Sequence, residues 1–483
     1  MNLLPFILFI LGWRPARSFS TWQPRGSNTL STTWQGPQEL LKFVDEYALS
    51  EYACSSESIL NRVAAHHRAD CQSATVLAVE QQDPAPTAVP SFEWIEVPDQ
   101  DTNYRLALTT TEPLLNTTSL QIIRQSAEHL WQTSVQTSRF TYQRQGNYEA
   151  HVSDLSLEAK QIVNDCLEDQ IYPLLRNTYC TDTPGRLCVY DALVIRYNAT
   201  EASSGAGQPL HRDLGMVSVN IMLNDPSEFV GGGTFFENQL RAWPQAPLKP
   251  AGPGRGLVHP SAERHAGSAT TAGVRDILVL FITLDSGETP PALVQSAWLK
   301  SCRNVCDEQH RDAPVKTVQC RVRHQRLAIE AVPTDGEAWQ YLGLALVEMA
   351  GLVGREELLR AAQDCLTQSL LHNPCDSRAY NNLALTLGRL ESPPTVVEET
   401  FRKGLDLLNR SQQAGCDVED ERDALVLNYG LHVSNQDRFA EACQILWPVA
   451  SRKEIYEQQG RPVSRVVNDV YRLWAFCSQQ LPQ

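Results

Sequence analysis

The sequence predicts an α+β multidomain protein, in which a sandwich or closed barrel of short strands with support helices precedes an all-α helical-repeat domain. A chain of 483 residues exceeds one typical hydrophobic core, so more than one domain is expected. Short strand-like runs dominate residues 187–284, and no helical pattern interrupts them. From residue 291 onward the apolar spacing is helical and repeats internally. We therefore divide the chain into residues 1–18, 19–110, 111–290, 291–325 and 326–483.

The first eighteen residues are typical of a signal peptide. An apolar run from Leu3 to Trp13 precedes the small residues Ala16 and Ser18, and it is shorter than the roughly 20 residues that span a bilayer. No acidic residue occurs before Glu39, whereas arginine, serine and threonine do, as in a transit peptide. We expect the secretory pathway, with the endoplasmic reticulum lumen as destination, or else an organelle reached through a transit peptide. We expect no stable membrane span.

Residues 19–110 combine a helical region with a Pro-rich linker. Apolar residues recur at helical spacing within residues 36–75, and the stretch "QQDPAPTAVPSF" then breaks the pattern. Two further helical segments, at residues 118–133 and 156–179, precede the strands and are expected to support them. The net charge of −15 argues against a nucleic-acid partner, because phosphate binding needs clustered lysine and arginine.

A histidine and an aspartate stand one residue apart at the head of the strand-like run "PLHRDLGMVSVNIMLND". Residues i and i+2 of an extended chain point to the same side, so His211 and Asp213 could share a metal ion. An ordinary polar pair at the end of a strand is the alternative that this spacing alone leaves open.

A later segment supplies the groups that this pair lacks. The stretch "GLVHPSAERHAGSATTAGVRDILVLFI" contains His259 and His265, and then Arg275 at the start of an apolar strand. Two histidines and one carboxylate can occupy one face of Fe(II) and leave three positions open, which an α-keto acid and dioxygen would fill. The far carboxylate of the keto acid needs a fixed cation, and a buried arginine offers it a planar fork.

The strand that begins at Arg275 alternates in character. Arg275 has the same parity as Ile277, Val279 and Phe281, so we expect its side chain to lie in an otherwise apolar cavity. Asp276 has the opposite parity and is expected to face outward.

Residues 187–284 resemble the catalytic domain of Fe(II)/2-oxoglutarate dioxygenases of the prolyl 4-hydroxylase and procollagen lysyl hydroxylase type. The segments that carry the resemblance occur in the order found in that family: "VIRYN", "HRD", "VSVNIMLND", "FVGGGTFFE", "GLVHP", "RHAG" and "GVRDILVLF". The resemblance implies a double-stranded β-helix, or jelly roll, as the core of a catalytic domain at residues 111–290.

The resemblance also implies roles for single residues, which are His211, Asp213 and His265 as iron ligands, Arg275 as the partner of the 2-oxoglutarate carboxylate, and Tyr197 and Thr234 as further contacts of the cosubstrate. It favours His265 over His259, because His265 lies ten residues before the arginine, as in the family. The loop between Tyr197 and His211 looks longer than in the family. The implied cofactors are Fe(II), 2-oxoglutarate and O2, with L-ascorbate as in many relatives.

The activity implied is hydroxylation of peptidyl proline or lysine, coupled to decarboxylation of 2-oxoglutarate to succinate and CO2. Two alternatives remain open. The barrel could be inactive and serve, with the helical repeats, as a scaffold that binds proteins. The chain could also be a dioxygenase that acts on a small molecule.

Cysteines gather at the junction, residues 291–325. Their spacing on helices could bring together four zinc ligands from the set Cys302, Cys306, His310, Cys320 and His324. In a secreted chain a disulfide is the interpretation we favour, and free thiols are the third possibility. Cys166, Cys180 and Cys188 flank the start of the strands and could form another bridge.

The last segment, residues 326–483, contains an internal repeat. The stretches "AWQYLGLALVEMA", "AYNNLALTLGRL" and "LVLNYGLHVSN" align on Gly343, Ala384 and Gly430. They resemble tetratricopeptide-type helical hairpins, in which small residues let paired helices approach, although the interval exceeds the roughly 34 residues of that family. A generic helical bundle is the alternative. A peptide or protein substrate, or a partner protein, is the ligand we expect there.

Overall fold

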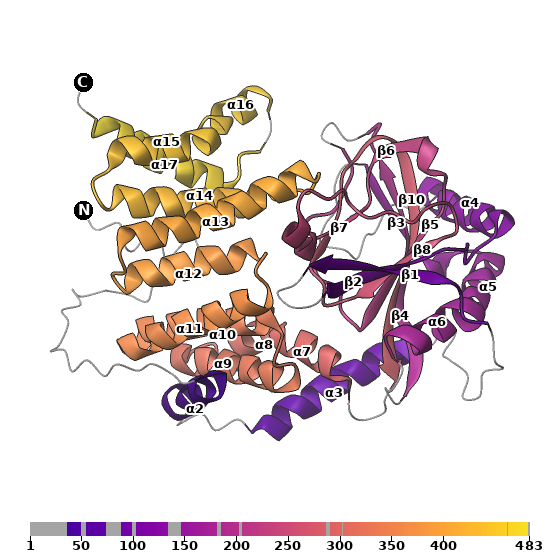
Figure 1. Cartoon of the computed structure of the whole chain (residues 1–483), viewed down its shortest axis with the longest axis horizontal. Coiled ribbons are helices and arrows are strands. Elements are labelled where there is room, and N and C mark those ends of the chain that lie inside the picture. Colours follow the sequence, from indigo (N-terminus) through magenta and orange to yellow (C-terminus); the bar gives the residue numbers. More distant parts are fainter. Residues whose placement is uncertain are drawn as a thin grey trace. The chain divides into compact units, whose positions relative to one another are not determined.

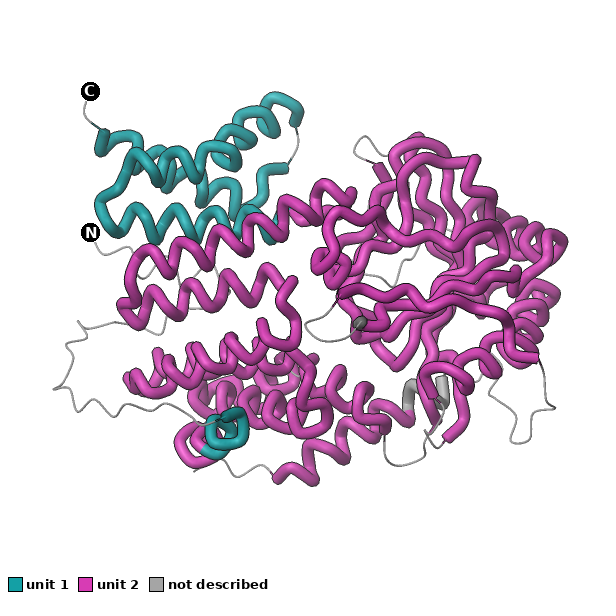
Figure 2. Tube along the Cα trace, viewed as in Figure 1, with its two compact units in different colours: residues 1–42, 419–483 teal, residues 43–418 magenta. Residues whose placement is uncertain are grey.

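The structure is a computed structural model that describes residues 36–49, 55–73, 88–98, 103–133, 146–180, 185–201, 205–285, 290–301, 303–460 and 462–481 (Figure 1). The expected signal peptide lies outside these residues, as do Cys302 and most of the Pro-rich linker. The chain divides into two compact units (Figure 2). The larger unit is formed by residues 43–418, and the smaller one by residues 1–42 and 419–483.

The strands of the larger unit build two antiparallel sheets. They are β1 (Phe92–Pro98), β2 (Asn103–Thr110), β3 (Asn147–His151), β4 (Arg186–Asn198), β5 (Val217–Met222), β6 (Phe229–Gly231), β7 (Thr234–Phe236), β8 (Gly256–Pro260), β9 (His265–Gly267) and β10 (Thr270–Asp285). The large sheet has the order β1-β2-β8-β5-β10-β4-β3, with β6 paired to β10 outside this path. The second sheet pairs β7 with β9. Strands that are distant in the sequence are thus neighbours in the large sheet.

Strand β10 is the longest and carries a different set of side chains on each face. Ile277, Val279 and Phe281 pack with residues of β4, in register with the pairing of Arg275 to Tyr197. The alternate residues from Leu278 to Leu284 join the main hydrophobic core on the opposite face. This alternation is the one expected from the sequence.

Three helices cover the core face of the large sheet: α4 (Thr117–Thr133), α5 (Leu157–Cys166) and α6 (Tyr172–Thr178) (Figure 1). Helix α4 packs Leu120, Ile123 and Ala127 into the main core. A π-helical turn at Leu167–Ile171 joins α5 to α6, and Pro173 stands in the first turn of α6. Proline has no N–H for an intrahelical bond, so the widened turn lets the chain continue past it.

Asp276 does point away from the Arg275 face, but it is not at the surface, and that expectation is corrected here. Its side chain is fully buried and pairs with Arg124 of α4 at 3.0 Å and with Arg196 of β4 at 2.8 Å. Helix α4 covers this face of the sheet and supplies a cation that sequence alternation alone does not show.

The remaining helices fall into two groups. At the start of the larger unit are α2 (Pro37–Ala48), which crosses the unit boundary, and α3 (Ser56–Ser73). After the strands come α7 (Ala292–Lys300), α8 (Arg303–Gln309), α9 (Pro314–Ala331), α10 (Gly336–Val353), α11 (Glu356–His372), α12 (Ser377–Arg389) and α13 (Pro394–Gln413). The smaller unit contains α14 (Glu419–Ser434), α15 (Phe439–Ala450), α16 (Arg452–Gln458) and α17 (Arg465–Gln479).

The helices after the strands pack as consecutive pairs, α10 with α11, α12 with α13 and α14 with α15. The small residues that aligned in the sequence lie where paired helices touch. A Cβ on Gly343 would be 2.9 Å from Leu366, and one on Gly430 would be 2.4 Å from Leu446. Ala384 is completely buried. The internal repeat is therefore a repeat of close helix contacts.

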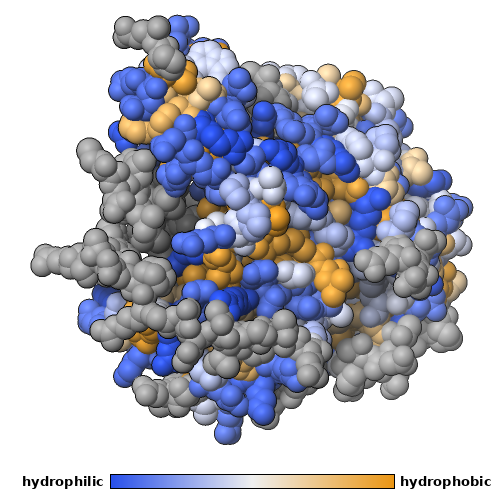
Figure 3. Space-filling view, turned by 60° about the vertical axis from the view of Figure 1, so that its left-hand side comes forward, coloured by the Kyte–Doolittle hydropathy of each residue, from blue (hydrophilic) through white to orange (hydrophobic). Residues whose placement is uncertain are grey.

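No helix of the described segments is long and apolar enough to cross a membrane. On the face shown in Figure 3, hydrophilic residues cover most of the described surface, and hydrophobic residues gather near the middle of the view. The most exposed large hydrophobic side chains are single residues of separate elements, namely Leu157, Val230, Leu371 and Trp447. Isolated exposed hydrophobic residues of this kind are ordinary in folded proteins.

Two glycines of helix α10 test whether close approach defines the repeat. Gly343→Ala should lower the free energy of unfolding by about 1–2 kcal/mol, because the added methyl group overlaps Leu366. Gly351 has only Arg389 nearby, at 3.8 Å, so Gly351→Ala in the same helix should raise stability by about 0.5–1 kcal/mol. Thermal unfolding of the two variants makes the comparison, and equal shifts of the same sign would contradict it.

Candidate metal centre

The structure brings together three side chains from the two segments that the sequence singled out. Ligand atoms of His211, Asp213 and His265 all lie within 4.8 Å of one another. The two carboxylate oxygens of Asp213 are each 3.5 Å from an imidazole Nε2, one from His211 and the other from His265. Two imidazoles and one carboxylate therefore face a common point.

Backbone pairing holds the two segments side by side. His211 and His265 form an isolated antiparallel bridge, with N–H···O distances of 2.8 and 2.9 Å in the two directions. The amide of Asp213 donates to the carbonyl of Ser261 at 3.1 Å. The regular strand β5 begins only at Val217, four residues after Asp213. The extended conformation expected at the pair thus comes from this bridge, before the regular strand.

Hydrogen bonds also fix which nitrogen of each imidazole is available. Nδ1 of His211 lies 2.8 Å from the Pro209 carbonyl, and Nδ1 of His265 lies 2.9 Å from the Glu263 carbonyl. A carbonyl only accepts, so both Nδ1 atoms carry a proton and both Nε2 atoms are directed at Asp213, where each could bind a metal through its lone pair when unprotonated. The Ser218 hydroxyl donates to Asp213 at 2.5 Å. Contacts of this type orient metal-binding side chains.

The electrostatics of Asp213 and His265 favour the forms that bind metal. Burial alone would raise the pKa of Asp213, but the neighbouring His265 and His211 outweigh it and hold that pKa below its usual range. Burial lowers the pKa of His265 to about 3. Burial would also lower the pKa of His211, yet its hydrogen bond and attraction to Asp213 leave it raised. At neutral pH the group thus presents a carboxylate and a neutral imidazole at His265, as a metal requires.

His259, the rival for the third position, lies behind the group. Its ring centroid is 4.5 Å from that of His265, and the ring is completely buried. Nδ1 contacts the Pro260 carbonyl at 3.0 Å, and Nε2 faces the Asn220 amide at 3.4 Å. Both nitrogens are thus directed at protein groups, and His259 packs as a support for His265.

Arg275 is a buried side chain near this group, and Tyr197 interacts electrostatically with both Arg275 and Asp213. Arg275 is 2% exposed, and its Nε and Nη1 atoms have no hydrogen-bond partner among the described residues. The Oγ1 of Thr270 is buried without a partner in the same way. Burial lowers the pKa of Arg275, with a smaller opposing effect of Tyr197. Leaving such groups unpaired costs free energy, so Arg275 and Thr270 are suited to an anionic acceptor that would pair with them.

Tyr197 lies close both to Arg275 and to the strand that carries His265. The Arg275 guanidinium carbon lies 5.2 Å from the centre of the Tyr197 ring. A Cβ on Gly267, two residues after His265, would be 3.2 Å from the Tyr197 hydroxyl. Burial raises the pKa of Tyr197 to about 12, so the hydroxyl stays protonated. Thr234 is buried in β7 opposite Gly267 of β9, so it lies on the same small sheet as His265.

The sequence did not show that a glycine, Gly232, leaves the space that the Arg275 side chain fills. Gly232 has a φ of +67°, and a Cβ there would be 2.9 Å from Cδ of Arg275 and 3.0 Å from the Thr270 hydroxyl. Only glycine tolerates both the backbone conformation and the close approach. The run of three glycines was the available signal, but it does not tell which side chain lies against it. Thr270 was missed as well.

Two arginines that adjoin the converging side chains are paired to the rest of the unit. Arg212, between His211 and Asp213, forms a partly buried ion pair at 3.0 Å with Glu337 of helix α10. Glu337 also pairs with Lys300 and Arg378, each at 3.2 Å. The three cations hold the pKa of Glu337 well below its usual range, although burial alone would raise it.

The second arginine, Arg264, precedes His265. It pairs with the buried Glu237, which also accepts a hydrogen bond at 3.2 Å from Asn373, beyond the end of α11. Both segments that carry the converging side chains are thus attached to helical hairpins of the same unit.

The chain matches no family model and no curated protein. Solved structures that resemble parts of it include an oxidoreductase of the 2OG-Fe(II) oxygenase family from Burkholderia pseudomallei, 15% identical over 38% of this chain and 85% of that one, with a TM-score of 0.27. A prolyl 4-hydroxylase structure from Phytophthora capsici is 14% identical over 56% and 84%, with a TM-score of 0.25. YrrB, a TPR protein with an unusual peptide-binding site, is 11% identical over 38% and 85%, with a TM-score of 0.23.

Removing the charge of Glu337 should loosen the segment that carries His211 and Asp213. Glu337→Gln leaves Arg212 and Lys300 buried beside a neutral side chain, and we expect a loss of about 3–5 kcal/mol of stability. Thermal unfolding measures this loss. Glu330→Gln is the control, because Glu330 is half exposed and pairs only along its own helix with Arg326. A Glu337 variant as stable as the Glu330 variant would contradict the idea that Glu337 stabilises this segment through Arg212.

Proposed function

We propose that the chain is an Fe(II)- and 2-oxoglutarate-dependent dioxygenase, with His211, Asp213 and His265 as the iron ligands. The observation that carries the proposal is the convergence of two Nε2 atoms and one carboxylate near Arg275, a buried arginine with two nitrogens that have no partner among the described residues. Two histidines and one carboxylate on one face of Fe(II) leave three positions open for substrates. The two sheets would form a double-stranded β-helix around this site.

The same ligand set can also hold zinc, so the arginine decides between the two chemistries. Hydrolysis at zinc needs only a bound water, whereas a 2-oxoglutarate enzyme needs a cation for the far carboxylate of the cosubstrate. The guanidinium of Arg275 has five N–H donors, and two of its nitrogens are buried without partners. A carboxylate that accepts two parallel N–H bonds matches this group, and the Thr270 hydroxyl would supply a further donor.

When bound, Fe(II) and 2-oxoglutarate would supply the oxidation, in which one atom of O2 enters a C–H bond of the substrate and the other enters succinate as CO2 leaves. The residues of the chain bind and orient the reactants. Arg275, Thr270 and Tyr197 would hold the cosubstrate, with Thr234 as a further contact. The apolar side chains of Leu193, Ile195, Ile277 and Val279 surround Tyr197 and would exclude water.

The substrate proposed is a proline or lysine residue of a peptide or protein, on the basis of the resemblance to prolyl and lysyl hydroxylases. The helical hairpins after the strands would bind that substrate or a partner protein. Ascorbate as a reductant and a location in the secretory pathway belong to the same proposal.

Metal loading of single variants tests the ligand assignment. Asp213→Asn should reduce the Fe(II) bound by the purified chain at least tenfold and abolish succinate release, because a neutral amide replaces the anionic ligand. Asp225→Asn is the matched control, since Asp225 caps an exposed 3-10 turn, where asparagine serves equally well. Metal analysis and a succinate assay are the measurements. Normal iron content in the Asp213 variant would contradict the assignment, and iron binding without turnover of any peptide would favour the scaffold alternative.

Two glycine substitutions test the proposed cosubstrate site. In Gly232→Ala the new methyl group would meet Arg275, so we expect the 2-oxoglutarate concentration needed for half-maximal turnover to rise by roughly tenfold or more, with iron binding retained. Gly252→Ala is the control, because Gly252 has no atom within 4 Å of the position of a Cβ. An unchanged 2-oxoglutarate requirement in the Gly232 variant would place the cosubstrate elsewhere.

A further inference from the structure

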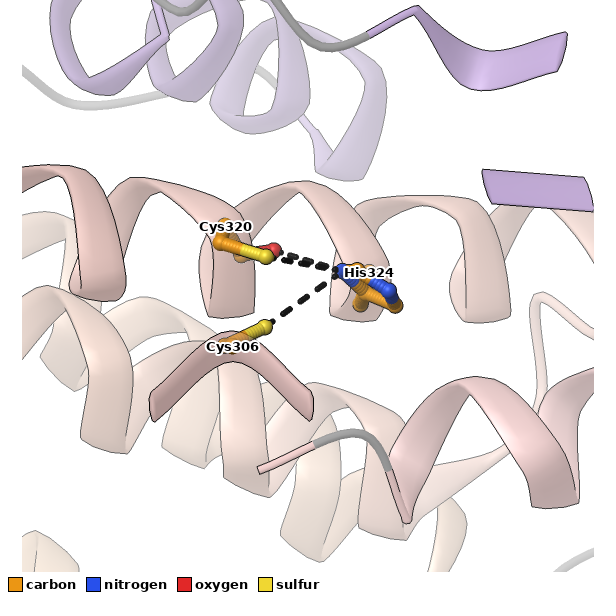
Figure 4. A group of neighbouring side chains, drawn as sticks. All are labelled: Cys306, Cys320 and His324. Atoms are coloured by element: carbon orange, nitrogen blue, oxygen red, sulfur yellow. Dashed lines mark hydrogen bonds between the residues drawn. The ribbon is translucent and has the colours of Figure 1, made fainter. Parts of the chain in front are cut away.

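A second group of metal-binding side chains lies in the helices that follow the strands. Cys306 of α8 and the pair Cys320 and His324 of α9 point their donor atoms at one another (Figure 4). Both cysteines are completely buried, and His324 is 4% exposed. Nδ1 of His324 lies 3.7 Å from the sulfur of Cys306 and 3.6 Å from that of Cys320.

We propose that Cys306, Cys320 and His324 bind a structural Zn²⁺ ion. Zinc binds sulfur at about 2.3 Å and imidazole nitrogen at about 2.0–2.1 Å in tetrahedral geometry, which sets sulfur and nitrogen ligands about 3.6 Å apart. The two sulfur–nitrogen distances of the structure match this separation. Thiolate and imidazole ligands suit zinc, whereas the His–Asp–His group contains no sulfur.

Helix geometry explains how the site is built. Cys320 and His324 are four residues apart in α9, so they lie on the same face of the helix. Helix α8 packs against α9 and adds Cys306 from the other side. The described residues thus supply three of the four ligands that a structural zinc site has. The full burial of both cysteines fits a structural role and leaves no open approach for a substrate.

A disulfide is the competing use of the same cysteines. Cys306 and Cys320 are not bonded to each other, so the disulfide expected at the junction is not present between these two. The bridge considered among Cys166, Cys180 and Cys188 is not present either. A disulfide would engage the two sulfurs and leave His324 without a function, whereas a metal engages all three side chains.

Metal binding changes protonation at the site. Nδ1 of His324 also lies 2.8 Å from the Cys320 carbonyl, to which a protonated Nδ1 donates. Zinc would replace this hydrogen bond, and the ion binds thiolates, so each Cys–SH that becomes Cys–S–Zn releases one proton. Proton release on adding Zn²⁺ is therefore part of the proposal.

The proposed zinc site lies on a helix that packs against the helices of the ion-pair cluster around Arg212. Helix α9 packs against α7 and α10. Lys300 of α7 and Glu337 of α10 belong to the ion-pair cluster that holds Arg212. A zinc ion that joins α8 to α9 would therefore stabilise the helices beside which the His211 segment is fixed.

Zinc counting in the full-length chain tests the proposal. We use Asp213→Asn as the background, so that zinc at the His–Asp–His group does not contribute. This protein should bind about one equivalent of Zn²⁺, and Co²⁺ in its place should give thiolate-to-cobalt absorption bands. Adding Cys306→Ser should abolish both signals. Adding Cys365→Ser, at an equally buried cysteine of α11 outside the group, should preserve them. Zinc content unchanged by Cys306→Ser would overturn the proposal.

A second measurement needs no substitution and so does not depend on the folding of a variant. Thiol alkylation followed by peptide mass spectrometry should show Cys306 and Cys320 protected in the zinc-loaded wild-type chain, and modified after a chelator is added. Cys365 should not change between the two conditions. A Cys306–Cys320 disulfide in the mapped peptides, or equal alkylation of these two cysteines with and without chelator, would overturn the proposal.

Discussion

The bridge between His211 and His265 is the interaction on which the candidate metal centre depends. Two backbone hydrogen bonds, at 2.8 and 2.9 Å, join segments that are far apart in the chain, and no side chain takes part in them. They place both imidazoles next to Asp213, while the Pro209 and Glu263 carbonyls turn each Nε2 toward it. Main-chain hydrogen bonds therefore set the positions of the three residues, and these positions do not depend on contacts among the three side chains.

Ion pairs fix the two segments that the bridge joins. Arg212 and Arg264 adjoin the converging side chains and are paired with Glu337 and Glu237 respectively. An isolated buried charge is costly, so each arginine keeps its segment close to a carboxylate at a fixed place. Glu337 belongs to helix α10, and Glu237 binds Asn373 after α11. The helical hairpin α10–α11 is thus part of the framework of the site, in addition to any surface it offers to a partner.

The sequence predicted those features that depend on local spacing. Alternation in β10 predicted the face of the strand on which Arg275 lies. The repeated small residues predicted the close helix contacts at Gly343 and Gly430. Apart from the meeting of the His211 and His265 segments, which the resemblance implied, contacts between distant segments were not predictable. The burial of Asp276 under α4 and the ion pair of Arg212 with Glu337 are of this kind. The domain boundaries, the cofactors and the substrate remain predictions, because they rest on resemblance or on residues that the structure does not describe.

The two proposed metal sites differ in the hardness of their ligands, and this difference would keep their metals apart. The His–Asp–His group contains only nitrogen and oxygen donors and has the buried cation Arg275 nearby, whereas the junction group contains two sulfurs and is fully buried. Divalent iron ranks below zinc in affinity for most ligands, so zinc would compete for the first site wherever it is abundant. A thiolate site in the same chain does not remove this competition, since each chain would bind only one zinc ion there. Selection of iron over zinc at the first site therefore has to come from the supply of iron and from the cosubstrate. The cosubstrate adds ligands that iron uses, and Arg275 would help to bind it.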